Sequence, residues 1–228
     1  QGDCKMTGPG VTGHLSGAQK TAQPDHLSED QRPAQDSHPS EGLQPAQDGR
    51  LSVRKAVIDD LPQIMEIFDH ARKFMKQTGN PTQWGDNYPP EEVIIDDIAV
   101  KGHMYVVTGG VGTSAGGTGE TGAESADGHI HGVFALIPGR DPTYDIIEDG
   151  AWLSDEEYST IHRVAGDGRV NGVFEAALRF SLAQTPHIRI DTHEDNAVMR
   201  HLIEKNGFQR TGMIYCRDGS LRIAYERV

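Results

Sequence analysis

The sequence predicts an α/β domain with a mixed central sheet and helices on both of its faces. Two observations favour this class. Short apolar strands early in the domain are linked as a hairpin, whereas later strands are connected through amphipathic helices. In addition, a strand over residues 161–164 runs into a glycine-bearing loop and then a helix. A loop of this kind presents free backbone N–H groups, and the positive end of the helix dipole, to an anion.

The domain is expected to span residues 51–228. Residues 1–50 contain no Phe, Tyr or Trp and are dominated by small and polar residues. Such a segment buries too little apolar surface to offset its ordering entropy, so it is predicted to be a disordered arm. Residues 108–128 are rich in glycine, which favours a flexible, enlarged hairpin loop; a substrate lid is the alternative.

The first half of the domain contains three predicted strands and two predicted helices. Residues 51–54 alternate as a strand does, and Asp59 or Asp60 is expected to cap a helix with Pro62 in its first turn. This helix ends at residues 79–81, and a second one is predicted over residues 91–99. Strands are predicted over residues 104–107 and 130–137, followed by an acidic, irregular passage.

The second half alternates strands and helices before a closing hairpin. Residues 169–172 are expected to open an amphipathic helix after the strand at residues 161–164. A strand over residues 188–190 and a helix from Asn196 follow. Strands over residues 208–216 and 221–226 are joined by a turn at Asp218 and Gly219, which is a strong hairpin signal.

Charge and cysteine usage exclude several classes of function. The net charge is −13, which argues against nucleic acid or an anionic membrane as the main partner. No apolar run is long enough to span a bilayer. Cys4 and Cys216 lie far apart and do not suggest a disulfide framework. We therefore expect a cytoplasmic protein without nucleic-acid or membrane partners.

Two sequence blocks carry a family resemblance. The first is the phosphate-loop pattern Gln/Arg-x-x-Gly-x-Gly/Ala, which stands here as Arg169 to Phe174, with Phe at the sixth position. The second is an Asn followed by a helix ending in Leu-Tyr-x-Lys-x-Gly-Phe. It begins here at Asn196 and ends at Phe208, with Ile203 in the tyrosine position. With both blocks in order, residues 51–228 resemble the GNAT superfamily of acetyl-coenzyme-A-dependent N-acetyltransferases.

The resemblance implies a fold, a cosubstrate and a reaction. The fold is a mixed, mostly antiparallel sheet of about six to seven strands, and strands four and five splay apart near Val164. The reaction is direct transfer of an acetyl group from acetyl-CoA to a primary amine in a ternary complex, without a metal. Loop N–H groups are expected to hold the pyrophosphate, and the backbone of Val164 to pair with the pantetheine arm. The predicted cofactor-binding residues are Val164, Gly168, Arg169, Val170, Asn171, Gly172, Val173 and Asn196. For Asn196, a simple helix N-cap is the alternative.

Three residues are candidates for the base that deprotonates the amine. A lysine-like amine with a pKa of about 10.4 is almost fully protonated at pH 7, so a base would help. Strand alternation places His162 on the same face as Val164; a core histidine bound to a backbone group is the alternative. His193 and Glu194 lie just beyond the fifth strand, where loops often carry function, or they form a solvated turn.

Protonation of the leaving thiolate has no evident donor. In the family the tyrosine at the place of Ile203 usually gives this proton. Tyr215, Cys216 or water could replace it, while sheet packing is the plainer role for both side chains.

Aromatic and histidine side chains supply the remaining candidates. Trp84, Tyr88 and Trp152 lie in irregular segments, where they would line the acceptor site or pack loops onto the sheet. His129 and His131 share one strand face but lack an evident third ligand, so they are interpreted as surface histidines and no metal is predicted.

Two other functions keep the same fold. One is a non-catalytic CoA-binding sensor or interaction module, and the other is transfer from a different acyl-CoA. The acceptor is expected to be a small-molecule or peptide amine. The acidic residues 141–157 suggest a cationic acceptor, or simply a solvated loop. By family analogy the chain is compatible with a homodimer.

Overall fold

The computed structural model describes residues 51–109 and 129–228. The predicted disordered arm at residues 1–50 lies outside the described residues, as do residues 110–128 of the predicted flexible loop. Thr108 and Gly109 differ from that prediction, because they continue a strand that pairs with its neighbours.

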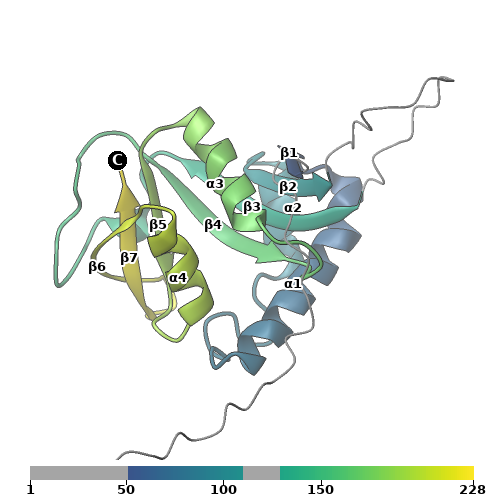
Figure 1. The fold of residues 1–228 in the computed structure, drawn as a ribbon, viewed down its shortest axis with the longest axis horizontal. Coiled ribbons are helices and arrows are strands. Elements are labelled where there is room, and N and C mark those ends of the chain that lie inside the picture. The colour runs from purple at the N-terminus through teal and green to yellow at the C-terminus, as the bar shows by residue number, and fades with distance from the viewer. Residues whose placement is uncertain (1–50, 110–128) are drawn as a thin grey trace, which may run out of the picture. The chain divides into compact units, whose positions relative to one another are not determined.

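Within residues 51–109 and 129–228, seven strands form one sheet in the order β1-β2-β3-β4-β5-β7-β6 (Figure 1). They are β1 (Leu51–Lys55), β2 (Met104–Gly109), β3 (Ile130–Pro138), β4 (Ser159–Gly166), β5 (Ile188–Thr192), β6 (Gln209–Tyr215) and β7 (Leu221–Arg227). Only β4 and β5 pair in parallel; every other neighbouring pair is antiparallel. The predicted mixed, mostly antiparallel sheet is confirmed.

In the part of the chain that the structure describes, four α-helices and two 3-10 turns accompany the sheet. They are α1 (Leu61–Gln77), α2 (Glu91–Ala99), α3 (Val173–Gln184), α4 (Ala197–Lys205), η1 (Ile58–Asp60) and η2 (Pro142–Tyr144). Within the two described ranges, no helix has both the length and the apolar character needed to cross a bilayer.

Two predicted helix starts are corrected. Gly172 adopts a left-handed conformation (φ 88°), so α3 begins at Val173 and residues 169–172 belong to the preceding loop. The Asp60 carboxylate does not cap α1. It accepts a hydrogen bond from the Val57 N–H (2.8 Å) and forms an ion pair with Arg54 of β1.

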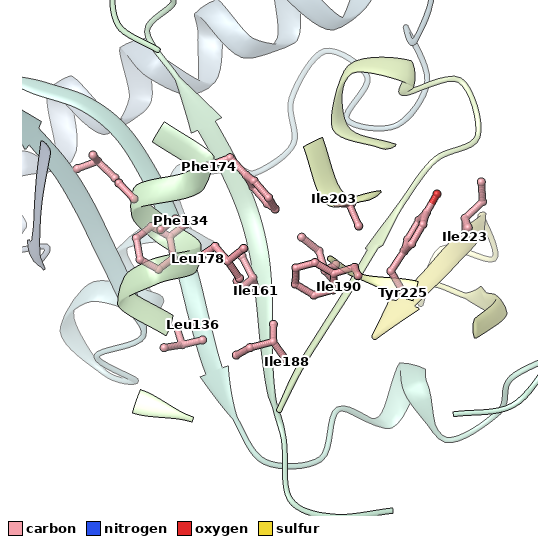
Figure 2. Packing of buried hydrophobic residues seen from close by; sticks show 14 residues of the cluster. Phe134, Leu136, Ile161, Phe174, Leu178, Ile188, Ile190, Ile203, Ile223 and Tyr225 are labelled. Atoms are coloured by element: carbon pink, nitrogen blue, oxygen red, sulfur yellow. The ribbon is translucent and has the colours of Figure 1, made fainter. Parts of the chain in front are cut away.

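Apolar side chains pack on both faces of the sheet. Figure 2 shows Phe174, Leu178 and Ile203, from α3 and α4, against Ile161 and Ile190 of the sheet. The start of α3 approaches the sheet closely at Gly132, where a Cβ atom would overlap the Val173 side chain. On the opposite face, α1 and α2 contribute buried apolar side chains to the core, namely Ile64, Ile67, Phe68 and Ile94. Helices thus cover both faces, as predicted, with α3 and α4 on one face and α1 and α2 on the other.

A β-bulge interrupts β4. Ala135 of β3 pairs with His162 and Val133 pairs with Ala165, so both Arg163 and Val164 lie opposite Phe134. Arg163 has φ 55°, an uncommon value for a residue with a side chain. A bulge of this kind bends a strand and re-aims its side chains.

The parallel pair β4–β5 is short. Its register includes only Ser159 with Ile188 and Thr160 with Arg189, after which the strands diverge (Figure 1). We call the opening beyond Thr160 and Arg189 the fork. The splay between strands four and five that the resemblance implied is thus present.

Candidate functional site

Four linked polar side chains meet at the fork, and a fifth, the buried Arg222, has its Nε 3.8 Å from Asp191 Oδ2. His162 and Asp191 each lie two residues beyond the last β4–β5 pair, and His162 Nδ1 is 3.8 Å from Asp191 Oδ1. The other ring nitrogen, Nε2, is 3.0 Å from Asp141 Oδ2. The Tyr144 hydroxyl donates to Asp191 Oδ1 at 2.7 Å. We call Asp141, Tyr144, His162 and Asp191 the fork cluster.

The placement of His162 corrects the prediction from strand alternation. Ala135, its partner in β3, belongs to the core under α1 and α2, whereas Val164 packs against the core under α3 and α4. The bulge at Arg163 adds one residue, so His162 and Val164 lie on opposite faces. The ring partner of His162 is a carboxylate rather than a backbone group.

Asp141 is held as a carboxylate. Burial alone would raise its pKa, but hydrogen bonds from His162 and from the backbone and hydroxyl of Thr143 outweigh burial and lower the pKa well below its usual value. A neutral His162 that donates its Nε2 proton to Asp141 has a lone pair on Nδ1, directed at the fork. This geometry suits a proton acceptor.

Tyr144 and Cys216 remain protonated beside Asp191. Burial, followed by the Asp191 charge, raises the pKa of the Tyr144 hydroxyl well above its usual value. The same two causes, in the same order, raise the pKa of the Cys216 thiol to about 11. Tyr215, in contrast, is 48% exposed at the end of β6. Of the two alternative proton donors predicted from the sequence, Cys216 is the one whose pKa the charge of Asp191 raises.

The loop of residues 167–172 has the properties of an anion site. Gly168 and Gly172 take left-handed conformations, with φ values of 73° and 88°. The Arg169 N–H donates to Asp167 Oδ1 at 2.9 Å, so it is engaged inside the loop. Among the described residues, no acceptor is found for the N–H groups of Gly168 and of residues 170–174. A diphosphate fits such a row of donors at a helix start.

The Arg169 side chain is also engaged. Its Nη1 lies 3.0 Å from Nε2 of His129, although the residue as a whole is exposed. Rotation away from His129 would be needed before the guanidinium could meet a phosphate.

Both departures from the family pattern are buried. Phe174 and Ile203 belong to the core under α3 and α4, with exposed fractions of 3% and 0% (Figure 2). Phe174 directs its ring into that core and so leaves the loop open. Ile203 offers no proton donor there.

Asn196 joins two segments beside the fork. Its Oδ1 accepts the Met199 N–H at 3.1 Å, so it is the N-cap of α4. Its Nδ2 donates to Gln83 Oε1 at 3.0 Å, and Gln83 accepts a second bond from Asn80 at 2.8 Å. The segment after α1 is thus tied to the start of α4.

The other predicted base candidates lie in the turn before α4. His193 Nδ1 accepts the Asp195 N–H at 3.2 Å, and Glu194 is exposed. The structure does not bring either side chain into the contacts of the fork cluster.

The three predicted acceptor-site aromatics are divided between two places. Trp84 packs edge-on against Phe68, with ring centroids 5.6 Å apart, and Tyr88 lies next to it at 6.3 Å. The Tyr88 hydroxyl is 3.5 Å from Arg163, whose guanidinium pairs with the buried Asp97 of α2.

Trp152 lies elsewhere, with its ring stacked on Tyr144 at 5.3 Å. It lines a cavity of about 1150 Å³, which also touches Pro138 and Ser159. Since Ser159 is the first residue of β4, this cavity adjoins the closed end of the β4–β5 pair, and Tyr144 of the fork cluster also lines it.

Sequence reasoning missed the two carboxylates of the fork cluster. Asp191 follows the apolar part of β5 and could have been found by extending that strand, which is predicted only to Ile190. Asp141 is 21 residues before His162 in an irregular segment, and no local pattern predicts their contact.

Comparisons with known proteins place the fold. No protein-family model and no curated protein matches the chain. A solved GNAT-family acetyltransferase from Streptococcus agalactiae is 32% identical, with a TM-score of 0.64, over 78% of this chain and 95% of that chain.

Two further solved structures agree in fold. A putative acetyltransferase from Staphylococcus aureus has 23% identity and a TM-score of 0.51, over 77% of this chain and 97% of that chain. A GNAT-family acetyltransferase from Listeria monocytogenes has 19% identity and a TM-score of 0.51, over 78% and 94%. From the streptococcal match and the forked sheet together, the chain belongs to the GNAT family of acetyltransferases.

Proposed function

We propose that the protein transfers an acetyl group from acetyl-CoA to a primary amine by direct attack in a ternary complex. The observation that carries this proposal is the fork cluster: His162, oriented by Asp141, faces Asp191 across the β4–β5 opening. Acetyl-CoA supplies the thioester, and the chain supplies its binding and the proton transfers.

The cofactor would be held by backbone groups. The free N–H groups of the 167–172 loop and the start of α3 bind the diphosphate. The edge of β4 beyond Thr160 has no pairing to β5 and can accept the pantetheine arm as an added strand. Val164 lies on this segment, as the sequence predicts.

The amine would be deprotonated within the fork cluster. Asp191 attracts the ammonium group, and His162 Nδ1, 3.8 Å away, removes one proton. The amine nitrogen then forms a bond to the carbonyl carbon while the carbon–sulfur bond breaks, and the nitrogen releases its second proton to solvent to give the neutral amide. Water gives the departing sulfur its proton, because Ile203 carries no O–H group.

Two measurements test this function. We expect acetyl-CoA to bind in isothermal titration, and free thiol to appear only when a primary amine is present. Gly172→Asp should abolish acetyl-CoA binding by adding bulk and negative charge to the loop. Gly219→Asp is the matched control, because Gly219 is also left-handed (φ 78°) and has open space around it. Absence of binding at millimolar acetyl-CoA would refute the proposal.

A CoA-binding sensor is the second candidate, and Ile203 at the place of the family's proton donor favours it. Tight acetyl-CoA binding without thiol release across a broad amine library would select this function. A panel of other acyl-CoA thioesters, assayed with the same amines, separates the acetyl specificity from a different acyl donor.

A further inference from the structure

Three potential metal ligands converge away from the fork. His129 directly precedes β3, His131 lies on it, and Asp167 directly follows β4. Asp167 Oδ2 is 2.9 Å from His131 Nδ1 and 3.2 Å from His129 Nε2. The three ligand atoms all lie within 4.8 Å of one another. The sequence lacked a third ligand for the two histidines, and the fold supplies it.

The separations suit one shared ion. Ligand atoms at about 2.0–2.1 Å from a tetrahedral Zn²⁺ lie about 3.3 Å from each other. The distance from Asp167 Oδ2 to His129 Nε2, 3.2 Å, is close to this value, and the distance to His131 Nδ1, 2.9 Å, is somewhat shorter. Two imidazole nitrogens and one carboxylate oxygen are also a donor set that divalent transition metals accept, with an open position for water.

The hydrogen-bond donors and acceptors around His129 and Asp167 favour a cation between these two residues. Arg169 Nη1 lies 3.0 Å from His129 Nε2, and a guanidinium only donates, so Nε2 is an acceptor with a lone pair. In the tautomer that accepts from Arg169, His129 Nε2 and Asp167 Oδ2 are two acceptors 3.2 Å apart. A cation placed between two such acceptors stabilises both.

The ligands are also held in place before any ion arrives. The Asp167 N–H donates to the His131 carbonyl at 2.9 Å, which fixes these two residues to each other. Asp167 Oδ1 accepts the Arg169 N–H at 2.9 Å, so Oδ2 is the oxygen left for a metal. Outer hydrogen bonds of this kind orient the ligands of metal sites.

An open side remains for a fourth ligand. His129 and Asp167 line a pocket of about 120 Å³, together with Glu66 and His70 of α1. The side chains of His129, His131 and Asp167 are 33%, 14% and 11% exposed, so an ion can reach them from solvent.

We propose that His129, His131 and Asp167 bind a divalent transition-metal ion, Zn²⁺, which ties the 167–172 loop to the start of β3. The ion takes the place of the Arg169 guanidinium at His129 and frees that side chain. Binding at this site requires neither acetyl-CoA nor an amine.

Metal titration of the full chain tests the proposal without any cosubstrate. Zn²⁺ is titrated in competition with a chromophoric chelator, and Co²⁺ serves as a probe through its visible absorption. We expect His131→Ala and Asp167→Asn to weaken Zn²⁺ binding at least about tenfold. Asp167→Asn retains an oxygen for the Arg169 N–H, so it changes the ligand charge with little change of loop structure.

His201→Ala is the matched control, because His201 is exposed on α4. Every variant keeps the upstream histidines His14, His26 and His38, so their background binding is constant. Equal Zn²⁺ affinity in the wild type and in a His129→Gln/His131→Gln double variant would overturn the proposal. If His131→Ala does not fold, as judged by circular dichroism, Asp167→Asn and His129→Gln decide the outcome on the same criterion.

Discussion

His162 has two carboxylates at different distances, and the difference matters for its chemistry. Asp141, at 3.0 Å, is near enough to fix the ring and its tautomer. Asp191, at 3.8 Å from the other nitrogen, is too far for a direct hydrogen bond. An ammonium group between Nδ1 and Asp191 can therefore meet a base and a counter-ion together.

Replacing His162 tests its role as the base. We expect His162→Gln to lower kcat by about 10²–10⁴-fold, while the KM for acetyl-CoA stays near the wild-type value. The residual rate should rise with pH as the amine loses its own proton. Steady-state kinetics across pH, with His201→Gln as the control, provide the measurement; an unchanged kcat contradicts the assignment.

Asp141 should contribute stability that depends on pH. Its folded pKa lies below the unfolded value of about 3.9, so the unfolded chain binds the proton first. The contribution is fully present above the unfolded pKa and is lost as the pH falls through the folded pKa. We expect Asp141→Asn to lower the free energy of unfolding at pH 7 by about 2 kcal/mol.

Denaturant titrations of the wild type and Asp141→Asn at pH 7, and again well below pH 4, measure this effect. The difference between the two proteins should shrink at the lower pH. A difference that stays constant with pH would show that the Asp141 charge is not its source.

At the scale of single elements, strand and helix positions were largely predictable from local pattern. The strand predicted from the alternation of residues 51–54 and the helix predicted over residues 91–99 are both present, because each depends on residues close together in the sequence. The bulge in β4 was not predictable, since it depends on how Arg163 and Val164 share one partner on β3. That single insertion is the reason that His162 and Val164 lie on opposite faces.

The site was predictable only in part for the same reason. The loop of residues 167–172 and Asn196 are local patterns that the sequence displays. Asp141, Asp191 and the contact of Asp167 with His131 depend on strand order and on segments distant in sequence. The sequence pattern of one strand does not indicate which side chains a neighbouring strand brings into contact with it.

The segment after η2 depends on close backbone packing against β6. Glu148 and Met213 exchange two backbone hydrogen bonds of 2.8 Å, and the Ala151 N–H donates to Thr211 at 3.0 Å. At Gly150 a Cβ atom would overlap the Thr211 carbonyl. Only glycine fits this approach.

Gly150→Ala should therefore separate this segment from β6. We expect the free energy of unfolding to fall by about 1–3 kcal/mol, the usual cost of overpacking. Gly166→Ala is a suitable control, because its Cβ would meet neighbours at an ordinary 3.6 Å. Equal stability of the two variants in denaturant titrations would argue against the close contact.

At the scale of the whole molecule, the excess of acidic residues determines how the surface interacts with charged ligands. The net charge of −13 attracts cations to the surface and disfavours anions. The anionic cosubstrate must then be held by local donors such as the 167–172 loop. The disordered arm, the cytoplasmic location and the homodimer stay predictions.

Salt should affect a cationic acceptor through this charge. We expect the KM for a cationic amine to rise severalfold as the Debye length falls from about 30 Å at 0.01 M salt to about 10 Å at 0.1 M. An aromatic amine that is uncharged at the assay pH should show little change. Kinetics at several NaCl concentrations compare the two, and equal responses would contradict long-range attraction.

Arg163 is the extra residue of the bulge in β4. Deleting it would leave Ile161, His162, Val164 and Ala165 on the faces that they now occupy, because strict alternation would then place them there unaided. The local bend, the ion pair with Asp97 and the contact with the Tyr88 hydroxyl would disappear. Curvature and chemistry in β4 are thus separable by a change of one residue in chain length.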